Sequence, residues 1–116
     1  MLKEEYYSNE ALYKKDWKLF RAKIPEWQEA YMERLNQEYI ALLSGDGNAS
    51  EKFWELYKRQ KKDKHCVGVQ ISMRGKSGMI SDILRFIYED VISINDLDGF
   101  SDELKEIISD YLKERS

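Results

Sequence analysis

The residues best suited to chemistry lie at positions 67–79, in the stretch VGVQISMRGKSGM. Gly75, Lys76 and Ser77 match the end of a phosphate-binding loop, whose amides surround the phosphates while Lys and a hydroxyl reach phosphate and Mg²⁺. That loop needs another glycine five positions before Gly75, and Gln70 stands there. It also needs a parallel sheet, whereas the 40 residues after Lys76 have a helical pattern. The spacing therefore argues against nucleotide hydrolysis by a P-loop.

A calcium loop is the second motif to consider, because Asp96, Asp98 and Gly99 have the spacing of an EF-hand. Ile94 then occupies the first ligand position, and Lys105 occupies the twelfth, where a bidentate Glu is required. Two essential ligands are missing. We expect this segment to be a capped turn between helices.

Other catalytic or metal-binding residues are scarce. His65 is the one histidine and Cys66 the one cysteine, so neither a zinc site of about four ligands nor a nucleophile with a His–acid pair can be assembled. We expect a partly buried cysteine beside a surface histidine, no cofactor and no enzyme activity. One cysteine forms no internal disulfide, which fits a reducing compartment.

Positive charge is concentrated in one segment. Residues 58–76 carry seven basic and one acidic side chain, net +6, against −3 for residues 1–57 and −6 for residues 77–116. Clustered Lys and Arg favour a phosphate backbone or an acidic protein surface. The alternative interpretation is a solvated helix end that balances the acidic remainder. The candidate residues for binding a polyanion or a partner are Lys58, Arg59, Lys61, Lys62, Lys64, Arg74 and Lys76.

Two kinds of nucleic-acid binding are not favoured. Residues 77–116 could form a helix-turn-helix, but the first turn of its recognition helix would present Asp102 and Glu103 to the phosphates. Residues 58–76 contain no aromatic side chain on which bases could stack, which argues against a single-strand site.

The elements that must position these residues are helices. Gly and Pro number six and one, and apolar residues recur at intervals of three and four. We expect an all-α fold, a compact bundle of about five helices in a single domain over residues 1–116, since this length suits one hydrophobic core. No apolar run approaches the roughly 20 residues that cross a bilayer, and the acidic start is unlike a signal peptide. These features predict a soluble, cytoplasmic protein without a membrane partner.

The first half of the chain predicts three helices. The first covers residues 9–24, and Pro25 begins the second, which runs to residue 44, because proline is tolerated at the first helical position. The third follows a capping box at Asn48 and Glu51 and continues to residue 64 as a solvated end. Its residues expected to pack inward are Phe53, Trp54, Leu56 and Tyr57.

The second half predicts an irregular connector and two further helices. The connector lies near residues 65–76 and includes a short extended segment at 67–71. The fourth helix covers residues 77–91 with Ser77 as its cap, and the fifth begins at Ser101, whose hydroxyl caps it.

Three groups of residues in roughly the last two-thirds of the chain carry a resemblance. They are Phe53-Trp54-Glu55-Leu56-Tyr57-Lys58-Arg59; Gly68-Val69 with Met73-Arg74, Ser77 and Met79; and Asp96-Leu97 with Phe100-Ser101-Asp102-Glu103-Leu104. These groups resemble a family of small uncharacterised helical proteins from Gram-positive bacteria. The resemblance implies a bacterial cytoplasmic helical domain and implies no activity, cofactor or catalytic residue.

The sequence as a whole favours binding over catalysis. Its aromatic and aliphatic helix faces exceed what one small core absorbs. We interpret the chain as a non-enzymatic accessory or regulatory module that binds another protein or itself. The alternative is a binder of nucleic acid or another polyanion that uses residues 58–76.

Overall fold

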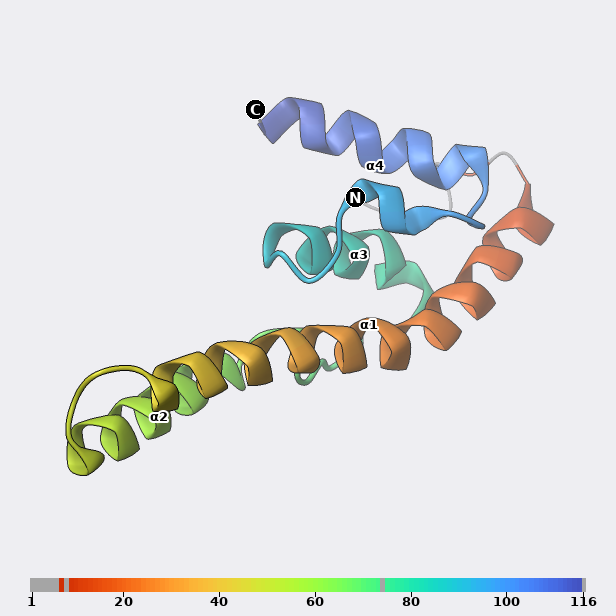
Figure 1. Ribbon diagram of the computed structural model, residues 1–116. Coiled ribbons are helices and arrows are strands. Elements are labelled where there is room, and N and C mark those ends of the chain that lie inside the picture. The colour runs from red at the N-terminus through yellow and green to blue at the C-terminus, as the bar shows by residue number, and fades with distance from the viewer. Residues whose placement is uncertain (1–6, 8, 74, 116) are drawn as a thin grey trace.

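The computed structural model describes residues 7, 9–73 and 75–115, and this part of the chain is helical and contains no strand (Figure 1). The predicted all-α class is confirmed, with four α-helices in place of about five among the described residues. None of these helices combines the length and apolar character needed to cross a bilayer. The elements are α1 (Glu10–Ser44), α2 (Ala49–Asp63), the 3₁₀ turn η2 (Lys76–Gly78), α3 (Met79–Tyr88), the 3₁₀ turn η3 (Ile94–Leu97) and α4 (Asp102–Arg115).

The boundary predicted at Pro25 is wrong, because this proline lies inside the single long helix α1. Proline removes one backbone hydrogen bond and costs about 3 kcal/mol in a helix interior. Phe20, Ile24 and Trp27 are buried on both sides of it. Burial of each such side chain contributes about 1.5–3 kcal/mol. Their combined packing outweighs the proline, so the helix continues.

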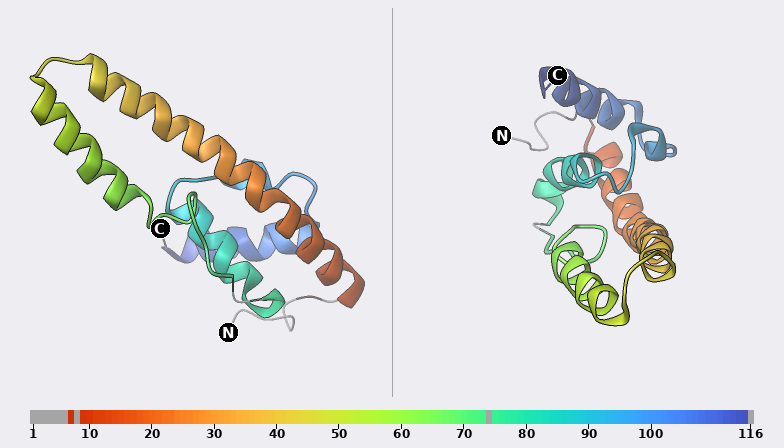
Figure 2. Two further views of the ribbon diagram at one scale, coloured as in Figure 1. Left: turned by 90° about the horizontal axis from the view of Figure 1, so that it is seen from below. Right: turned by 60° about the vertical axis from the view of Figure 1, so that its left-hand side comes forward.

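The first half of α1 packs against α3, η3 and α4, and together they form what we call the head (Figures 1 and 2). Aromatic rings occupy its centre. Phe86 meets Phe20 edge to face at 6.2 Å between ring centroids and lies 5.4 Å from Trp27. Around them are the fully buried side chains of Val67, Met79, Ile83, Leu97, Leu104 and Ile108.

A buried carboxylate fixes α4 to α1. Asp16 is 2% exposed. Its Oδ1 accepts the backbone N–H of Ser101 at 2.9 Å, and its Oδ2 accepts the hydroxyls of Ser101 at 2.6 Å and Tyr7 at 3.0 Å. The Ser101 hydroxyl accepts the backbone N–H of Leu104 at 3.2 Å, which confirms the predicted cap. The positive end of α4 and three donated hydrogen bonds compensate for burying this charge.

The second half of α1, the loop after it and α2 form a helical arm that projects from the head (Figure 1). Gly47 has φ +127°, a conformation that suits glycine. The predicted capping box is confirmed, because the Asn48 side chain accepts the N–H of Glu51 at 2.9 Å and Glu51 accepts the N–H of Asn48 at 3.3 Å. The two helices of the arm run antiparallel, as both views in Figure 2 show.

The arm makes the molecule elongated. Its principal extents are 58 × 29 × 22 Å and its radius of gyration is 17.3 Å, whereas a compact domain of this length has a radius of about 13 Å. The predicted compact bundle is therefore wrong. The reason is that α2 packs along α1 and contributes no residue to the hydrophobic core described above.

The connector between the arm and the head is irregular, as predicted, but residues 67–71 form no strand. The Cys66 carbonyl accepts the N–H of Val69 at 2.9 Å, so the chain turns here. Val67 is fully buried, and its N–H donates to Oε1 of Glu89 at 2.9 Å. The polar backbone of this segment is thus satisfied by turns and side chains instead of a strand partner.

The fourth predicted helix is shorter than expected. The turn η2 precedes α3, and Gly78 stands at the N-cap with no side-chain hydrogen bond, so the predicted cap at Ser77 is wrong. Asp90 then adopts φ 61° and reverses the chain, which lets the N–H of Val91 donate to the Phe86 carbonyl at 2.9 Å. This reversal ends the helix before residue 91.

Residues 94–99, which have part of the spacing of a calcium loop, form a capped turn, as expected. The backbone N–H of Ser93 donates to Oδ2 of Asp96 at 2.8 Å and closes a capping box over η3. The Asp96 carboxylate is thereby used within the turn.

Candidate interaction surface

Helix α2 turns its aromatic residues to solvent. None of its residues is buried. The partly shielded ones recur every three or four positions and mark the face toward α1; they are Lys52, Leu56, Arg59 and Asp63. The aromatic residues lie off this face, with Phe53 63%, Trp54 62% and Tyr57 54% exposed. The prediction that these three residues pack inward is wrong.

Polar contacts with α1 determine which face of α2 is covered. Arg59 Nη2 lies 2.7 Å from Oε1 of Glu38 and 3.4 Å from Oδ2 of Asp63. The guanidinium carbon of Arg59 lies 5.5 Å from the centroid of the Tyr39 ring, and the Tyr39 hydroxyl donates to Asp63 at 2.7 Å. Rotating α2 to bury its aromatic residues would break these charge-assisted hydrogen bonds.

The same contacts raise the pKa values of two side chains of the arm, Tyr39 and Arg59. Burial, and then the hydrogen bond to Asp63, raises the pKa of Tyr39 to about 12. The hydrogen bond to Glu38 raises the pKa of Arg59 above its usual value. Both groups keep their protons at neutral pH, so the contacts between α1 and α2 are complete there.

The exposed rings of α2 form one cluster, which we call the aromatic cluster (Phe53, Trp54 and Tyr57). The centroids of Phe53 and Trp54 are 5.1 Å apart and those of Trp54 and Tyr57 are 5.8 Å apart, both with nearly perpendicular rings. The ammonium of Lys61 lies 5.9 Å from the Tyr57 ring. Edge-to-face contacts of this kind contribute about 0.5–1.5 kcal/mol each. They hold the three rings in a defined arrangement before any partner binds.

Apolar residues of α1 extend this surface. A groove between α1 and α2 is lined by Asn36 and Gln60, among others. Leu43 follows Asn36 by two helical turns, and Phe53 precedes Gln60 by two turns, so both lie on the side of the arm that carries this groove. Ile40, one turn after Asn36, lies there too. Leu43 is 45% and Ile40 is 55% exposed.

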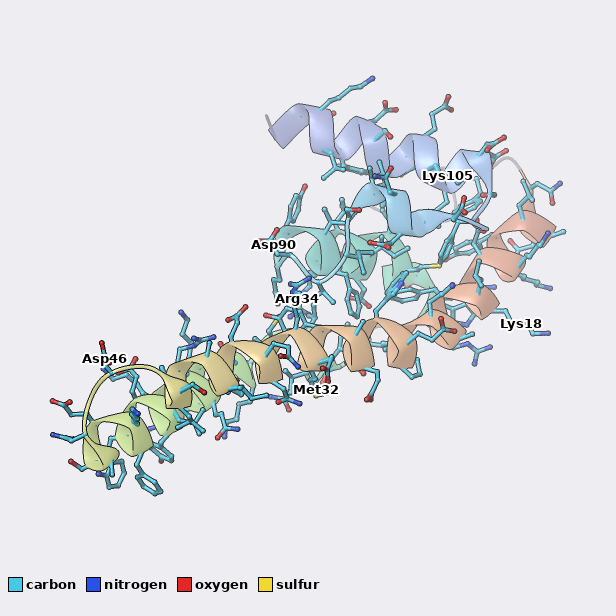
Figure 3. The ribbon with its side chains drawn as sticks, viewed as in Figure 1. Lys18, Met32, Arg34, Asp46, Asp90 and Lys105 are labelled. Carbon is cyan, nitrogen blue, oxygen red and sulfur yellow. The ribbon has the colours of Figure 1, made fainter. Side chains whose placement is uncertain are left out.

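We define the arm surface as the aromatic cluster together with Ile40 and Leu43. On the other side of the arm, Trp54 also lines an open groove of about 550 Å³ with Ala41 and Glu55. Asp46 marks the free end of the arm in Figure 3 and contributes to this groove. The arm surface therefore continues around the tip into a concave site.

The seven basic candidates do not form one patch. Lys76 lies 3.4 Å from Glu10 and 4.8 Å from the Tyr13 ring, near the start of α1. Arg59 instead contacts Glu38, which is about 40 Å further along that helix. Arg74 lies outside the described residues. The remaining four candidates are exposed on α2 and just after it: Lys58, Lys61, Lys62 and Lys64.

The histidine and the cysteine follow the end of α2. His65 is exposed and Cys66 is partly buried, as predicted. Among the described residues, no three His, Cys, Asp or Glu side chains are grouped so that they could hold a metal ion. The arm is suited to binding through its apolar and charged side chains.

The arm surface could have been found from the sequence by one signal. The four α2 residues that face α1 are Lys, Leu, Arg and Asp, and only one of them is apolar. The aromatic residues occupy a different stripe and end at Tyr57. A stripe that spans little more than one turn is too short to bury a 15-residue helix, which indicates a local surface.

Comparisons of the chain with protein families, with curated proteins and with solved structures find no match. The resemblance to helical proteins of Gram-positive bacteria stays a prediction.

Proposed function

We propose that this protein is a non-enzymatic accessory or regulatory module that binds another polypeptide through its arm surface. The observation that carries the proposal is the exposure of Phe53, Trp54 and Tyr57, each more than half accessible, on a helix without a buried residue. The largest exposed apolar patch of a monomeric protein typically covers about 300–600 Å² and is often functional.

The residue types fit this role. Trp and Tyr are the residues that contribute most to binding energy at protein interfaces, because they offer large area with few rotatable bonds. Trp54 and Tyr57 already pack edge to face, so little side-chain freedom is lost on binding. The charged residues around them provide the polar rim that such interfaces have.

The test is capture of partners by the tagged protein from its own cells. Wild type is compared with Trp54→Glu and with Tyr57→Glu. The matched control is Ile94→Glu, which changes an exposed apolar residue of the head. We expect a stoichiometric partner to be lost with both arm variants and retained with the control. A partner retained by both arm variants would contradict the proposal.

Polyanion binding is the second candidate, supported by the four exposed lysines at positions 58, 61, 62 and 64. Such binding releases condensed counterions and weakens steeply with salt. It is measured by fluorescence anisotropy of labelled double-stranded RNA against wild type and a Lys61→Glu/Lys62→Glu variant. Binding that depends on neither salt nor these lysines rules this candidate out.

A further inference from the structure

We propose that the polypeptide bound by the arm is a second copy of this chain, with α2 of one copy antiparallel to α2 of the other. The inference rests on the proposed function, because it names the partner of the same surface. Three features support it: the order of charges along one edge of α2, the position of the aromatic cluster relative to those charges, and the apolar area available.

One edge of α2 carries two acids followed by two bases, Glu51, Glu55, Lys58 and Lys62, and all four are exposed. They are separated by four, three and four residues, so they form one row along the helix. The spacing is the same from either end, while the sign of the charge reverses. A row of this kind is complementary to itself when the second copy runs in the opposite direction.

Within one chain, the same row places like charges together. Glu51 and Glu55 are one turn apart, as are Lys58 and Lys62, and like charges at this spacing destabilise a helix. In the part of the chain that the structure describes, Glu55, Lys58 and Lys62 have no ion-pair partner. An antiparallel second copy supplies opposite charges to all of them.

One two-fold axis, between residues 56 and 57, aligns both the charges and the rings. It places Glu51 opposite Lys62 of the second copy, and Glu55 opposite Lys58 of the second copy. At 1.5 Å per residue, the centre of the aromatic cluster lies about 3 Å along the helix from this axis. The two aromatic clusters therefore overlap along the helix axis, as a symmetric interface requires. Around the helix, Trp54 is the ring that lies beside the charged row, and Phe53 lies on the far side from it.

The apolar area is sufficient for a small specific interface. At roughly 60% exposure of the 150–250 Å² that each aromatic residue buries, the cluster offers about 350 Å² per copy. Covering the three rings of both copies would bury about 700 Å², and the side chains of the charged row add to this area, which places the contact at the small end of specific interfaces.

Acidic residues argue against two other occupants. Glu51 and Glu55 adjoin the aromatic cluster, and Asp46 lies at the end of the arm. An anionic lipid surface or a nucleic acid that covered the rings would meet these carboxylates together with Lys58 and Lys61. A second copy instead offers an opposite charge to each member of the row. A different protein remains the competing outcome of the experiment.

The direction of pairing is tested by charge reversal in sedimentation equilibrium. Glu55→Lys and Lys58→Glu each replace two opposite-charge contacts by two like-charge contacts across the axis, so each is expected to raise the dimer dissociation constant roughly tenfold. The double variant Glu55→Lys/Lys58→Glu regains both contacts with reversed signs and is expected to dimerise like wild type. Ile94→Glu serves as the control and is expected to have no effect.

The inference is overturned if wild type stays monomeric at several hundred micromolar, or if the double variant is weaker than either single variant. Circular dichroism of each variant checks that it is helical. Because all the changed residues are exposed, folding is expected to be unaffected.

A second experiment separates failure of this inference from failure of the proposed function. Tyr57 is replaced by p-benzoylphenylalanine, and the protein is irradiated in its own cells. An adduct of twice the chain mass of 13.9 kDa supports pairing of two copies. An adduct with a different protein alone overturns the pairing and leaves the proposed function standing. The absence of any adduct overturns both.

Discussion

Gly68 joins the arm to the head at a point where the backbone passes against an aromatic ring. A Cβ at this position would lie 2.2 Å from Cδ2 and 2.6 Å from Cγ of Tyr31. These atoms are at the base of the ring, and the neighbouring Arg34 guanidinium packs over that ring at 4.9 Å. Tyr31 cannot move aside without disturbing this contact, so the connector requires glycine here.

Substitution Gly68→Ala is therefore expected to lower the free energy of unfolding by about 1–3 kcal/mol, the cost of overpacking. Gly45→Ala is the matched control, because its Cβ would make ordinary contacts of 3.5 and 3.6 Å and its φ is −79°. Urea unfolding followed by circular dichroism measures both variants. Equal losses in the two variants would show that the contact with Tyr31 is not the cause.

Tyr39 makes the stability of the folded protein depend on pH in the alkaline range. Its pKa is raised to about 12 in the folded protein, against about 10 in the unfolded chain. The protonated phenol therefore favours the folded state, and this contribution is complete below pH 10 and is lost as the pH rises through about 12. We expect wild type to lose more stability between pH 10 and 12 than Tyr39→Phe, measured by urea unfolding at each pH. Tyrosines common to both proteins cancel in the comparison, so identical slopes would refute the assignment.

At the scale of elements, the structural features that depend on a few adjacent residues were predicted correctly. The capping box at Asn48 and Glu51 and the cap at Ser101 were correct, because each depends on a side chain and an amide three residues away. The prediction of an irregular connector was also correct, since Gly68 and Gly75 interrupt the apolar spacing there. The all-α class followed from spacing alone.

The features decided by contacts between distant residues were predicted wrongly. The helix continues through Pro25 because packing by α3 and α4 holds the residues around it. Likewise, the face of α2 that packs against α1 depends on the hydrogen bond from Arg59 to Glu38, which lies 21 positions earlier in the chain. Amphipathic spacing alone assigned the aromatic cluster to the core, since it contains no information about which partner covers a helix.

Helix α1 is continuous but bends along its length, as Figure 1 shows, and this leads to a prediction for its proline. Pro25 is exposed within the helix, so Pro25→Ala restores a backbone donor without removing a packed side chain. We expect the free energy of unfolding to rise by about 1–3 kcal/mol, since proline is about 3 kcal/mol less favourable than alanine in a helix interior and the bend relieves part of this cost. Glu26→Ala, at the exposed neighbouring position, is the control. A destabilised Pro25→Ala variant would mean that the head requires the bend.

At the scale of the whole molecule, stability is distributed unevenly. The hydrophobic core lies in the head, where Phe20, Phe86 and Leu104 are completely or almost completely buried. The arm is held by polar contacts, by partly shielded residues and by the buried Leu35 of α1, and α2 has no buried residue. Regions with few buried apolar contacts open locally at a lower free energy than the global unfolding reaction.

Hydrogen exchange measures this difference and connects it to self-pairing. Amides of α2 are expected to exchange through local opening, faster than those of α3 and α4, when the protein is dilute. At concentrations where two copies pair through α2, mass action stabilises the closed arm. Protection in α2 should then rise with protein concentration, while protection in α4 stays constant because the head takes no part in the pairing. Trp54→Glu should abolish the concentration dependence and leave the exchange of α4 unchanged. If α2 and α4 instead exchange together at every concentration, the arm and the head unfold as one cooperative unit, and the arm is more firmly attached than its burial indicates.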